Sequence, residues 1–194
     1  MDLPNDLASH LRDLVDSIGA DDTLTESLEA LAGHLRSAVS SYLGLRLTLV
    51  LDGWPVTMTA FSVVDGIRPA TSLRLNLSSQ GPGYDSQSQI VFYGGTAGAF
   101  VDLAADIDYL HRRDRAQTDG DGQHPAVMLD IDLPPVTLVS GFTGLAEYAT
   151  INRAVGLLIG RGHDPDQARA TLHRGAAASG LALHLYAAQL LDVG

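Results

Sequence analysis

The sequence predicts an α+β body, in which helices pack on an antiparallel sheet, followed by a separate bundle of three helices. Three observations lead to this fold class. Apolar residues recur at helical spacing before residue 44, they alternate from residue 45 to 94, and helical spacing returns beyond residue 143. The chain has 194 residues, of which 45% are hydrophobic, and this is enough apolar material for one ordinary domain or two small ones.

Two helices are expected at the start of the chain. Residues 5–18 have apolar side chains at helical spacing, and Gly19 follows as a stop. A second helix is predicted from residue 22 or 23 to residue 43, with Gly44 ending it. Its apolar stripe, which we interpret as core or as a dimer seam, consists of Leu24, Leu28, Leu31, Leu35, Val39 and Leu43.

Alternating apolar residues then predict four strands. They span residues 45–51, 56–63, 72–78 and 89–94. Asp52-Gly53 supplies the turn of a hairpin between the first two. A helix over residues 97–111 completes a body that we assign to residues 1–111.

Residues 112–142 are predicted to form a linker. Its first part, 112–124, is charged and contains glycine. Residues 126–133 have a strand-like pattern that Pro134-Pro135 halts, and the short apolar stretch 136–139 would dock the linker on the body.

The last domain, residues 143–194, is predicted as three helices. They cover residues 143–159, 164–179 and 182–191. The second has the strongest local signal in the chain, because Asp164 can cap its free amides, Pro165 occupies its first position and Gln167 completes a capping box.

This domain resembles an ANTAR domain, a three-helix module that binds RNA hairpins in transcription antitermination regulators. The scaffold residues of the resemblance are Ile151, Ala154, Gly156, Leu157, Leu158, Ala168, Leu172, Leu183 and Ala187. The body resembles a GAF domain, a small-molecule sensor, through its order of elements and its strand-turn-helix run from Ile90 to Phe100. Only the short segment Val64–Thr71 stands where GAF domains have the roof of their pocket, so we expect a sheet without a ligand.

The polar positions of the resemblance differ from the family pattern. Val155, His173 and Ala182 stand where basic residues are expected. The side chains that we expect to contact RNA are therefore Arg153, Arg161, His173 and Arg174. The net charge of −11 gives no support for nucleic-acid binding, although the segment from Leu145 onward is neutral, with four Arg against four acidic residues.

The resemblance implies a cytoplasmic, homodimeric regulator that binds an RNA hairpin and is not an enzyme. We expect no cofactor and no metal ion, since no catalytic or phosphate-binding motif occurs in the sequence. No apolar run is long enough for a membrane span. The glycine-rich Asp119–Gly122 is interpreted as a flexible linker rather than a calcium loop, and Asp130 and Asp132 as the wet face of an edge strand.

Two alternatives stay open. In the first, the bundle is a protein-interaction or dimerisation module without RNA binding, and Val155 enlarges the apolar surface of its first helix. In the second, the body is a small-molecule sensor with a working pocket under its sheet. A solid core of Leu and Phe side chains would argue against the second.

Overall fold

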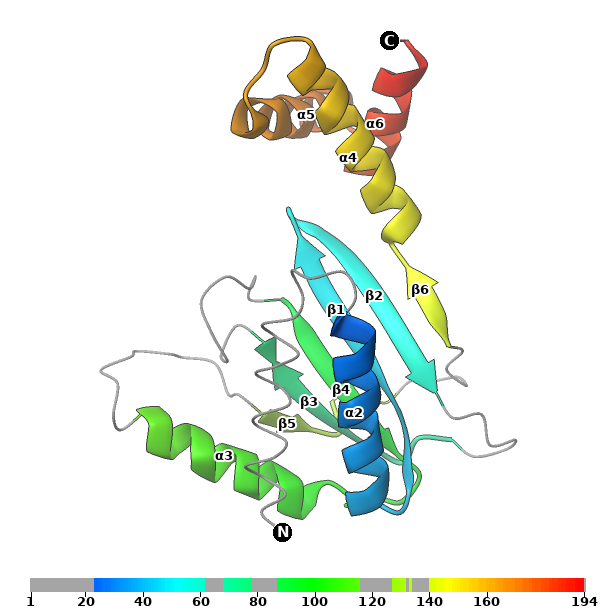
Figure 1. Ribbon diagram of the computed structural model, residues 1–194, viewed down its shortest axis with the longest axis vertical. Helices are drawn as coiled ribbons and strands as arrows, with labels where there is room; N and C mark the ends of the chain where they lie inside the picture. The colour runs from blue at the N-terminus through cyan, green and yellow to red at the C-terminus, as the bar shows by residue number, and fades with distance from the viewer. Residues whose placement is uncertain are drawn as a thin grey trace. The chain divides into compact units, whose positions relative to one another are not determined.

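The computed structural model describes residues 23–61, 68–77, 87–115, 127–131, 133 and 140–193. Within these residues the fold is α+β, with six strands in one sheet and five helices (Figure 1). The chain divides into two compact units, residues 1–141 and 142–194. The helix predicted over residues 5–18 lies outside the described residues.

The sheet has the strand order β5-β3-β4-β1-β2-β6. Its strands are β1 (Tyr42–Leu51), β2 (Trp54–Phe61), β3 (Thr71–Asn76), β4 (Gln89–Gly94), β5 (Val127–Leu129) and β6 (Gly141–Thr143). The pairs β1–β2, β1–β4, β3–β4 and β3–β5 are antiparallel. The predicted hairpin turn at Asp52-Gly53 is present, and both residues have the positive φ that such tight turns require.

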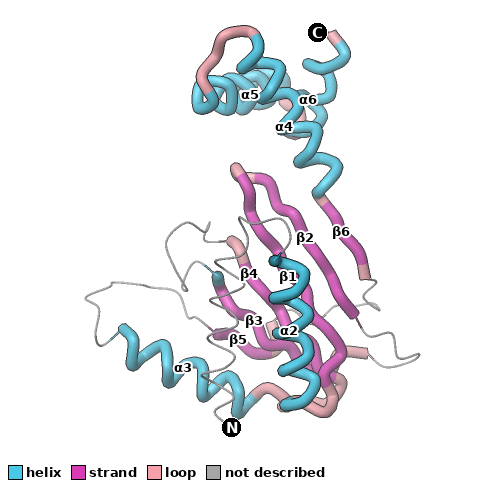
Figure 2. The backbone as a smooth tube through the Cα atoms, in the orientation of Figure 1, coloured by secondary structure: helices cyan, strands magenta, loops and turns pink. Residues whose placement is uncertain are grey.

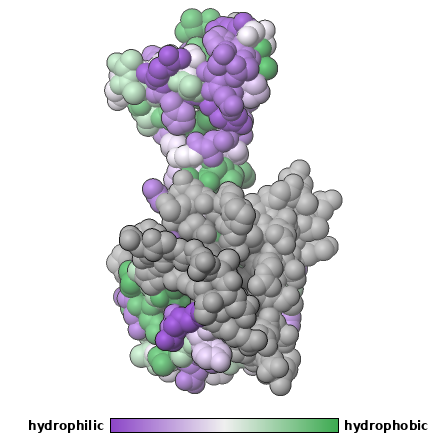
Figure 3. All heavy atoms as spheres, turned by 90° about the vertical axis from the view of Figure 1, so that its left-hand side faces the viewer, coloured by the Kyte–Doolittle hydropathy of each residue, from purple (hydrophilic) through white to green (hydrophobic). Residues whose placement is uncertain are grey.

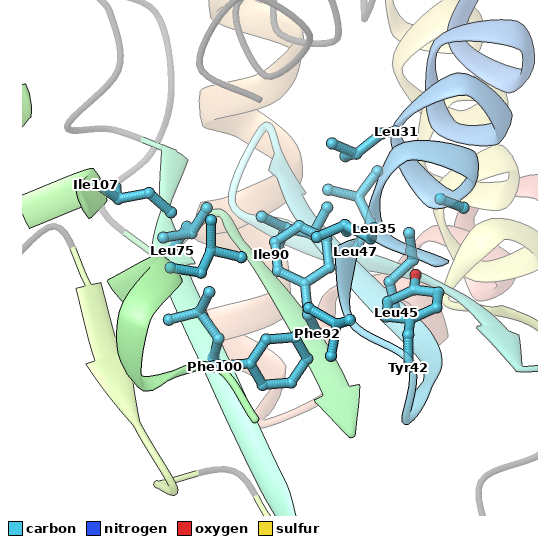
Figure 4. Close-up of a cluster of buried hydrophobic side chains, with 14 of the residues drawn as sticks. Leu31, Leu35, Tyr42, Leu45, Leu47, Leu75, Ile90, Phe92, Phe100 and Ile107 are labelled. Carbon is cyan, nitrogen blue, oxygen red and sulfur yellow. The ribbon is translucent and has the colours of Figure 1, made fainter. Parts of the chain in front are cut away.

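One face of the sheet packs against helices α2 (Thr23–Ala38) and α3 (Val101–Arg115). Because side chains alternate along a strand, Leu45, Leu47 and Leu49 of β1 all point to this face. Figure 4 shows Leu45 and Leu47 in one cluster with Ile90 and Phe92 of β4. Leu35 of α2 and Ile107 of α3 belong to the same cluster. The helix side of the sheet is therefore a filled core of Leu, Ile and Phe side chains among the described residues.

Helix α2 ends at Ala38, five residues before the predicted end at Leu43. The chain turns through a hydrogen bond from Tyr42 N to Val39 O at 2.9 Å and enters β1. Gly44 lies within β1 beside a register shift, with φ of 154°. A Cβ there would overlap the backbone of Ala60 and Phe61, so glycine permits close strand pairing instead of ending a helix.

The range predicted as linker contributes three pieces of regular structure. Helix α3 begins at Val101 and continues to Arg115, and β5 and β6 both join the sheet. Strand β5 pairs with β3 from Leu73 to Leu75, and Val127 and Leu129 pack on the helix-side core. The body thus extends beyond residue 111, because short strands gain their stability from sheet neighbours that are distant in sequence.

The second unit consists of α4 (Leu145–Gly160), α5 (Pro165–Ser179) and α6 (Leu183–Asp192), shown in Figure 2. Each helix packs against the other two. Their buried side chains are Ile151, Ala154, Val155, Leu158, Ala168, Leu172, Ala176 and Ala187. Four of these eight are alanines, so the helix backbones approach closely.

The predicted ends of α5 are confirmed, whereas the first helix begins at Leu145 and not at residue 143, because Thr143 belongs to β6. The carboxylate of Asp164 accepts a hydrogen bond from Gln167 N at 2.8 Å, and Pro165 occupies the first turn of α5. Gly180 ends α5 in the left-handed conformation with φ of 67°. The ring of Tyr186 on α6 lies directly over Gly175 on α5, where a Cβ would overlap it.

Candidate functional site

The four residues expected to contact RNA are all exposed on the three-helix unit. Arg153 lies on α4, Arg161 is the C-cap of that helix, and His173 and Arg174 are neighbours on α5. Arg153 and Arg161 are eight residues apart, which corresponds to about 12 Å along a helix axis. The structure therefore places two of the side chains on α4 and its C-cap and two on α5, where His173 and Arg174 are neighbours in sequence.

On α4, Arg153 points away from the buried stripe formed by Ile151, Ala154 and Leu158. Its Nε donates to Ala149 O at 3.3 Å and its Nη2 lies 3.5 Å from Thr150 Oγ1. Arg161 donates its backbone N–H to Leu157 O at 3.2 Å and Leu158 O at 3.1 Å, which closes the helix. Among the described residues, neither guanidinium forms a salt bridge with a carboxylate.

On α5, His173 and Arg174 follow the buried Leu172 and lie on the exposed side of the helix. Arg174 Nη2 lies 3.4 Å from Thr171 Oγ1, a contact within the same helix face. One turn earlier, Arg169 approaches Asp166 at 3.6 Å in an exposed ion pair. Such a pair contributes little to stability in water but reduces the local positive charge.

The N-terminus of α5 is not an anion site. Helix N-termini attract phosphate through their free amides, but here the Asp164 carboxylate accepts one of these N–H groups. Asp166 adds a second negative charge in the same turn. An RNA phosphate would be repelled from this end of the helix.

Two of the positions without the expected basic residue have opposite environments. Val155 is only 8% exposed and belongs to the bundle core, whereas Ala182 is exposed at the N-cap of α6. The expectation that Val155 enlarges an apolar surface of α4 is therefore wrong, because its side chain packs within the same chain. Ala182 is a surface position that contributes little to the packing of the bundle.

Exposed apolar side chains on this unit were missed at the sequence level. Leu145 and Leu185 are each 51% exposed, Ile159 is 42% exposed and Leu181 is 37% exposed. Figure 3 shows one face of these helices, on which hydrophilic residues lie together with hydrophobic ones. A signal existed for Leu185, which lies two residues after Leu183 and so falls off the apolar stripe of its helix.

In the body, Asp130 is exposed directly after the edge strand β5, as predicted, and it also holds that strand to β3. Its Oδ1 accepts hydrogen bonds from Thr71 Oγ1 at 2.7 Å and Ser72 N at 2.9 Å. Its backbone has φ of 57°, a conformation that Asp tolerates better than most residues. Asp132 and the Asp119–Gly122 segment lie outside the described residues.

Within the described ranges, no three His, Asp or Glu side chains gather as ligands for a metal ion. None of the described helices has both the length and the apolar composition that crossing a membrane requires.

Comparison with protein-family models, with curated proteins and with solved structures gave no match to this chain.

Proposed function

We propose that this chain is a transcription regulator that binds RNA hairpins through an ANTAR-like three-helix unit. By this proposal the GAF-like body serves for sensing or dimerisation, and the whole protein acts as a cytoplasmic homodimer. Binding of a hairpin in a nascent transcript would favour reading through a terminator.

The proposal is best supported by the division of the unit into two sets of residues. Most of the apolar residues that carry the ANTAR resemblance form the core, and the proposed RNA contacts are exposed. Of the scaffold residues that carry the ANTAR resemblance, Ile151, Ala154, Leu158, Ala168, Leu172 and Ala187 are buried between the helices. The proposed RNA contacts are exposed. This arrangement fits a module whose apolar pattern maintains the bundle and whose polar pattern meets the ligand.

The proposed contacts have the chemistry that a hairpin requires. The guanidinium group of an arginine binds two phosphate oxygens at once through parallel hydrogen bonds, and it stacks on unpaired bases. His173 adds a planar ring beside Arg174. Because Arg161 is at one end of α4 and Arg153 is two turns earlier, the α4 contacts would meet different phosphates along one strand.

The unit as a whole provides little electrostatic attraction. From residue 142 onward it has four Arg and four acidic residues, so its formal charge is zero and the remaining chain accounts for the total of −11. We therefore expect weak binding of RNA with a shallow dependence on salt, and discrimination that arises from loop bases rather than from phosphate contacts.

A second candidate function is supported by a separate observation. Four large apolar side chains of the unit are exposed instead of packed in its core, namely Leu145, Ile159, Leu181 and Leu185. Exposed apolar side chains that gather into a patch commonly mark protein contacts. By this alternative the unit is a protein-interaction or dimerisation module without RNA binding.

Binding of the full chain to a paired-hairpin RNA, measured by fluorescence anisotropy at 50 and 150 mM salt, separates the two candidates. Under the RNA proposal, the protein prefers the hairpin to a scrambled RNA, and Arg174→Ala weakens binding about tenfold. Arg36→Ala, which removes an exposed arginine from α2 in the other unit, is the matched control and should leave binding unchanged. Absence of hairpin binding at low salt, where electrostatic attraction is strongest, would favour the protein-interaction function.

A further inference from the structure

The outer side of α3 presents a row of exposed side chains. Val101, Ala105 and Tyr109 follow one another at intervals of four residues, so they lie along one face of the helix. Val101 is 52% exposed and Tyr109 is 63% exposed. The opposite side of the helix packs in the core of the body through Leu103, Ala104 and Ile107. The outer face of α3 is therefore open to solvent and includes two large apolar side chains.

Charged side chains border this row and are divided along the helix. Asp102 and Asp106 lie in its first two turns, both exposed, and neither forms an ion pair among the described residues. Nearer the end of the helix, Arg112 Nη2 lies 2.8 Å from Asp108 Oδ2. Because this pair is exposed, Arg112 keeps donors for a second carboxylate. The face thus has free carboxylates in its first half and a guanidinium in its second half.

This face is complementary to itself when two copies of α3 run in opposite directions. A two-fold axis at the level of Ile107 makes neighbours of residues that are equally distant from this position. Ala105 then lies beside Tyr109 of the second copy, and Asp102 lies beside Arg112 of the second copy. The large ring meets the smallest side chain of the row, and a carboxylate meets a guanidinium. The symmetry repeats both contacts, so the pair of helices has two of each.

We propose that the outer face of α3 is the contact surface of a homodimer, in which the helices of two copies pack antiparallel. The inference rests on the homodimer of the proposed function and names the surface that forms it, but it does not require RNA binding. One pair of helices buries less than the ~800 Å² per partner of a standard interface. The dissociation constant should therefore lie in the micromolar range.

Other partners match this face less well. RNA would be repelled by Asp102 and Asp106, and a basic peptide that is attracted to them would be repelled by Arg112. Two copies of this chain each have a net charge of −11, but salt at physiological concentration screens this repulsion beyond about 8 Å. The contacts between Asp102 and Arg112 act at shorter range. The charges on α3 therefore favour a second copy as its occupant.

Sedimentation equilibrium of the full chain at physiological salt, over a wide range of concentrations, measures the association. Asp102→Arg and Arg112→Asp should each weaken it about tenfold, because each reversal places like charges opposite one another at both ends of the helix pair. An equal mixture of these two variants should associate as tightly as the unchanged protein. In a mixed dimer both of these contacts again join opposite charges.

Two further variants complete the test. Tyr109→Ala should weaken the association about tenfold, since it removes an apolar contact that occurs twice. Arg36→Asp reverses an exposed charge on α2 and is the matched control, which should associate like the unchanged protein. Circular dichroism of each variant establishes that it is folded.

The proposal would be overturned by a protein that stays monomeric at every concentration. A dimer that both charge reversals leave unchanged would also overturn it, as would a mixture that associates no better than its two components. Binding of hairpin RNA by the unchanged protein is measured separately. Restored association in the mixture, together with absence of hairpin binding, would support the α3 contact while contradicting the RNA function.

Discussion

Asp130 fastens the end of β5 to the start of β3 through the fully buried hydroxyl of Thr71. The Oγ1 of Thr71 donates to Asp130 Oδ1 at 2.7 Å, and the same oxygen accepts Ser72 N at 2.9 Å. A return bond from Asp130 N to Ser72 O, also 2.9 Å, completes the connection. The three-residue strand β5 thus has a polar clamp at the point where its ladder ends.

Replacement of Asp130 by Ala should destabilise the body by about 1.5–3 kcal/mol, because the buried Thr71 hydroxyl loses its charged acceptor. Asp130→Asn should cost less, since an amide oxygen still accepts both bonds and Asn tolerates the positive φ. Urea unfolding followed by fluorescence of Trp54, the single tryptophan, reports on the sheet. Equal midpoints for Asp130→Ala and the unchanged protein would show that the clamp does not contribute.

Gly44 and Gly33 should respond to alanine in opposite directions. At Gly44 a Cβ would overlap Ala60 and Phe61, and φ is 154°, so Gly44→Ala should cost more than about 2 kcal/mol. Gly33 lies inside α2 with no atom within 4 Å of the added carbon. Gly33→Ala should therefore stabilise the body by about 0.5–1 kcal/mol. The same unfolding measurement checks both, and a tolerated Gly44→Ala would contradict the close pairing of β1 with β2.

The position of Gly44 also shows what the sequence could and could not predict. The bounds of β4 and the cap of α5 follow from local patterns, and the structure confirms both. The end of α2 does not, because Leu43 continues the helical stripe from Val39 and equally begins the alternation of β1. Pairing of Gly44 with Phe61 and Tyr93, which are distant in sequence, decides between them.

The same limit applies to the candidate site. Exposure of Arg153, Arg161, His173 and Arg174 could be expected, since charged side chains seldom enter a small core. Their grouping depends on how the helices pack, and the apolar spacing does not specify this. The burial of Val155 likewise depends on contacts with neighbouring helices. The pattern on α4 alone could therefore not establish whether its side chain is buried or faces solvent.

The stability of the body should fall in alkaline solution through Tyr42. Burial raises the pKa of its phenol above the ordinary value, and the charge of Arg36 offsets this only in part. The folded state thus favours the neutral phenol. Its contribution is fully present below the unfolded pKa of about 10 and is lost as pH rises toward the higher folded value. Tyrosine ionises at roughly pH 9 to 11 in an unfolded chain. Between these pH values the Tyr42→Phe variant should therefore lose less stability than the unchanged protein. Parallel losses in urea unfolding across this range would contradict the assignment.

The positions of Val155 and Ala182 predict different results when arginine is introduced. Val155→Arg would place an unpaired charge in the bundle core, where Val155 is 8% exposed, and should destabilise the three-helix unit by roughly 3–5 kcal/mol. Ala182→Arg adds a cation at an exposed N-cap and should leave the unit folded.

If the unit binds RNA, Ala182→Arg should tighten binding of the hairpin and steepen the dependence of the logarithm of affinity on the logarithm of salt by about one. Thermal unfolding by circular dichroism measures the loss of stability in Val155→Arg. A salt titration with hairpin RNA measures the change of affinity in Ala182→Arg. A stable Val155→Arg protein would mean that α4 packs differently, because an arginine between three close helices has no access to water. Unchanged hairpin affinity in Ala182→Arg would instead count against α6 lying near the RNA.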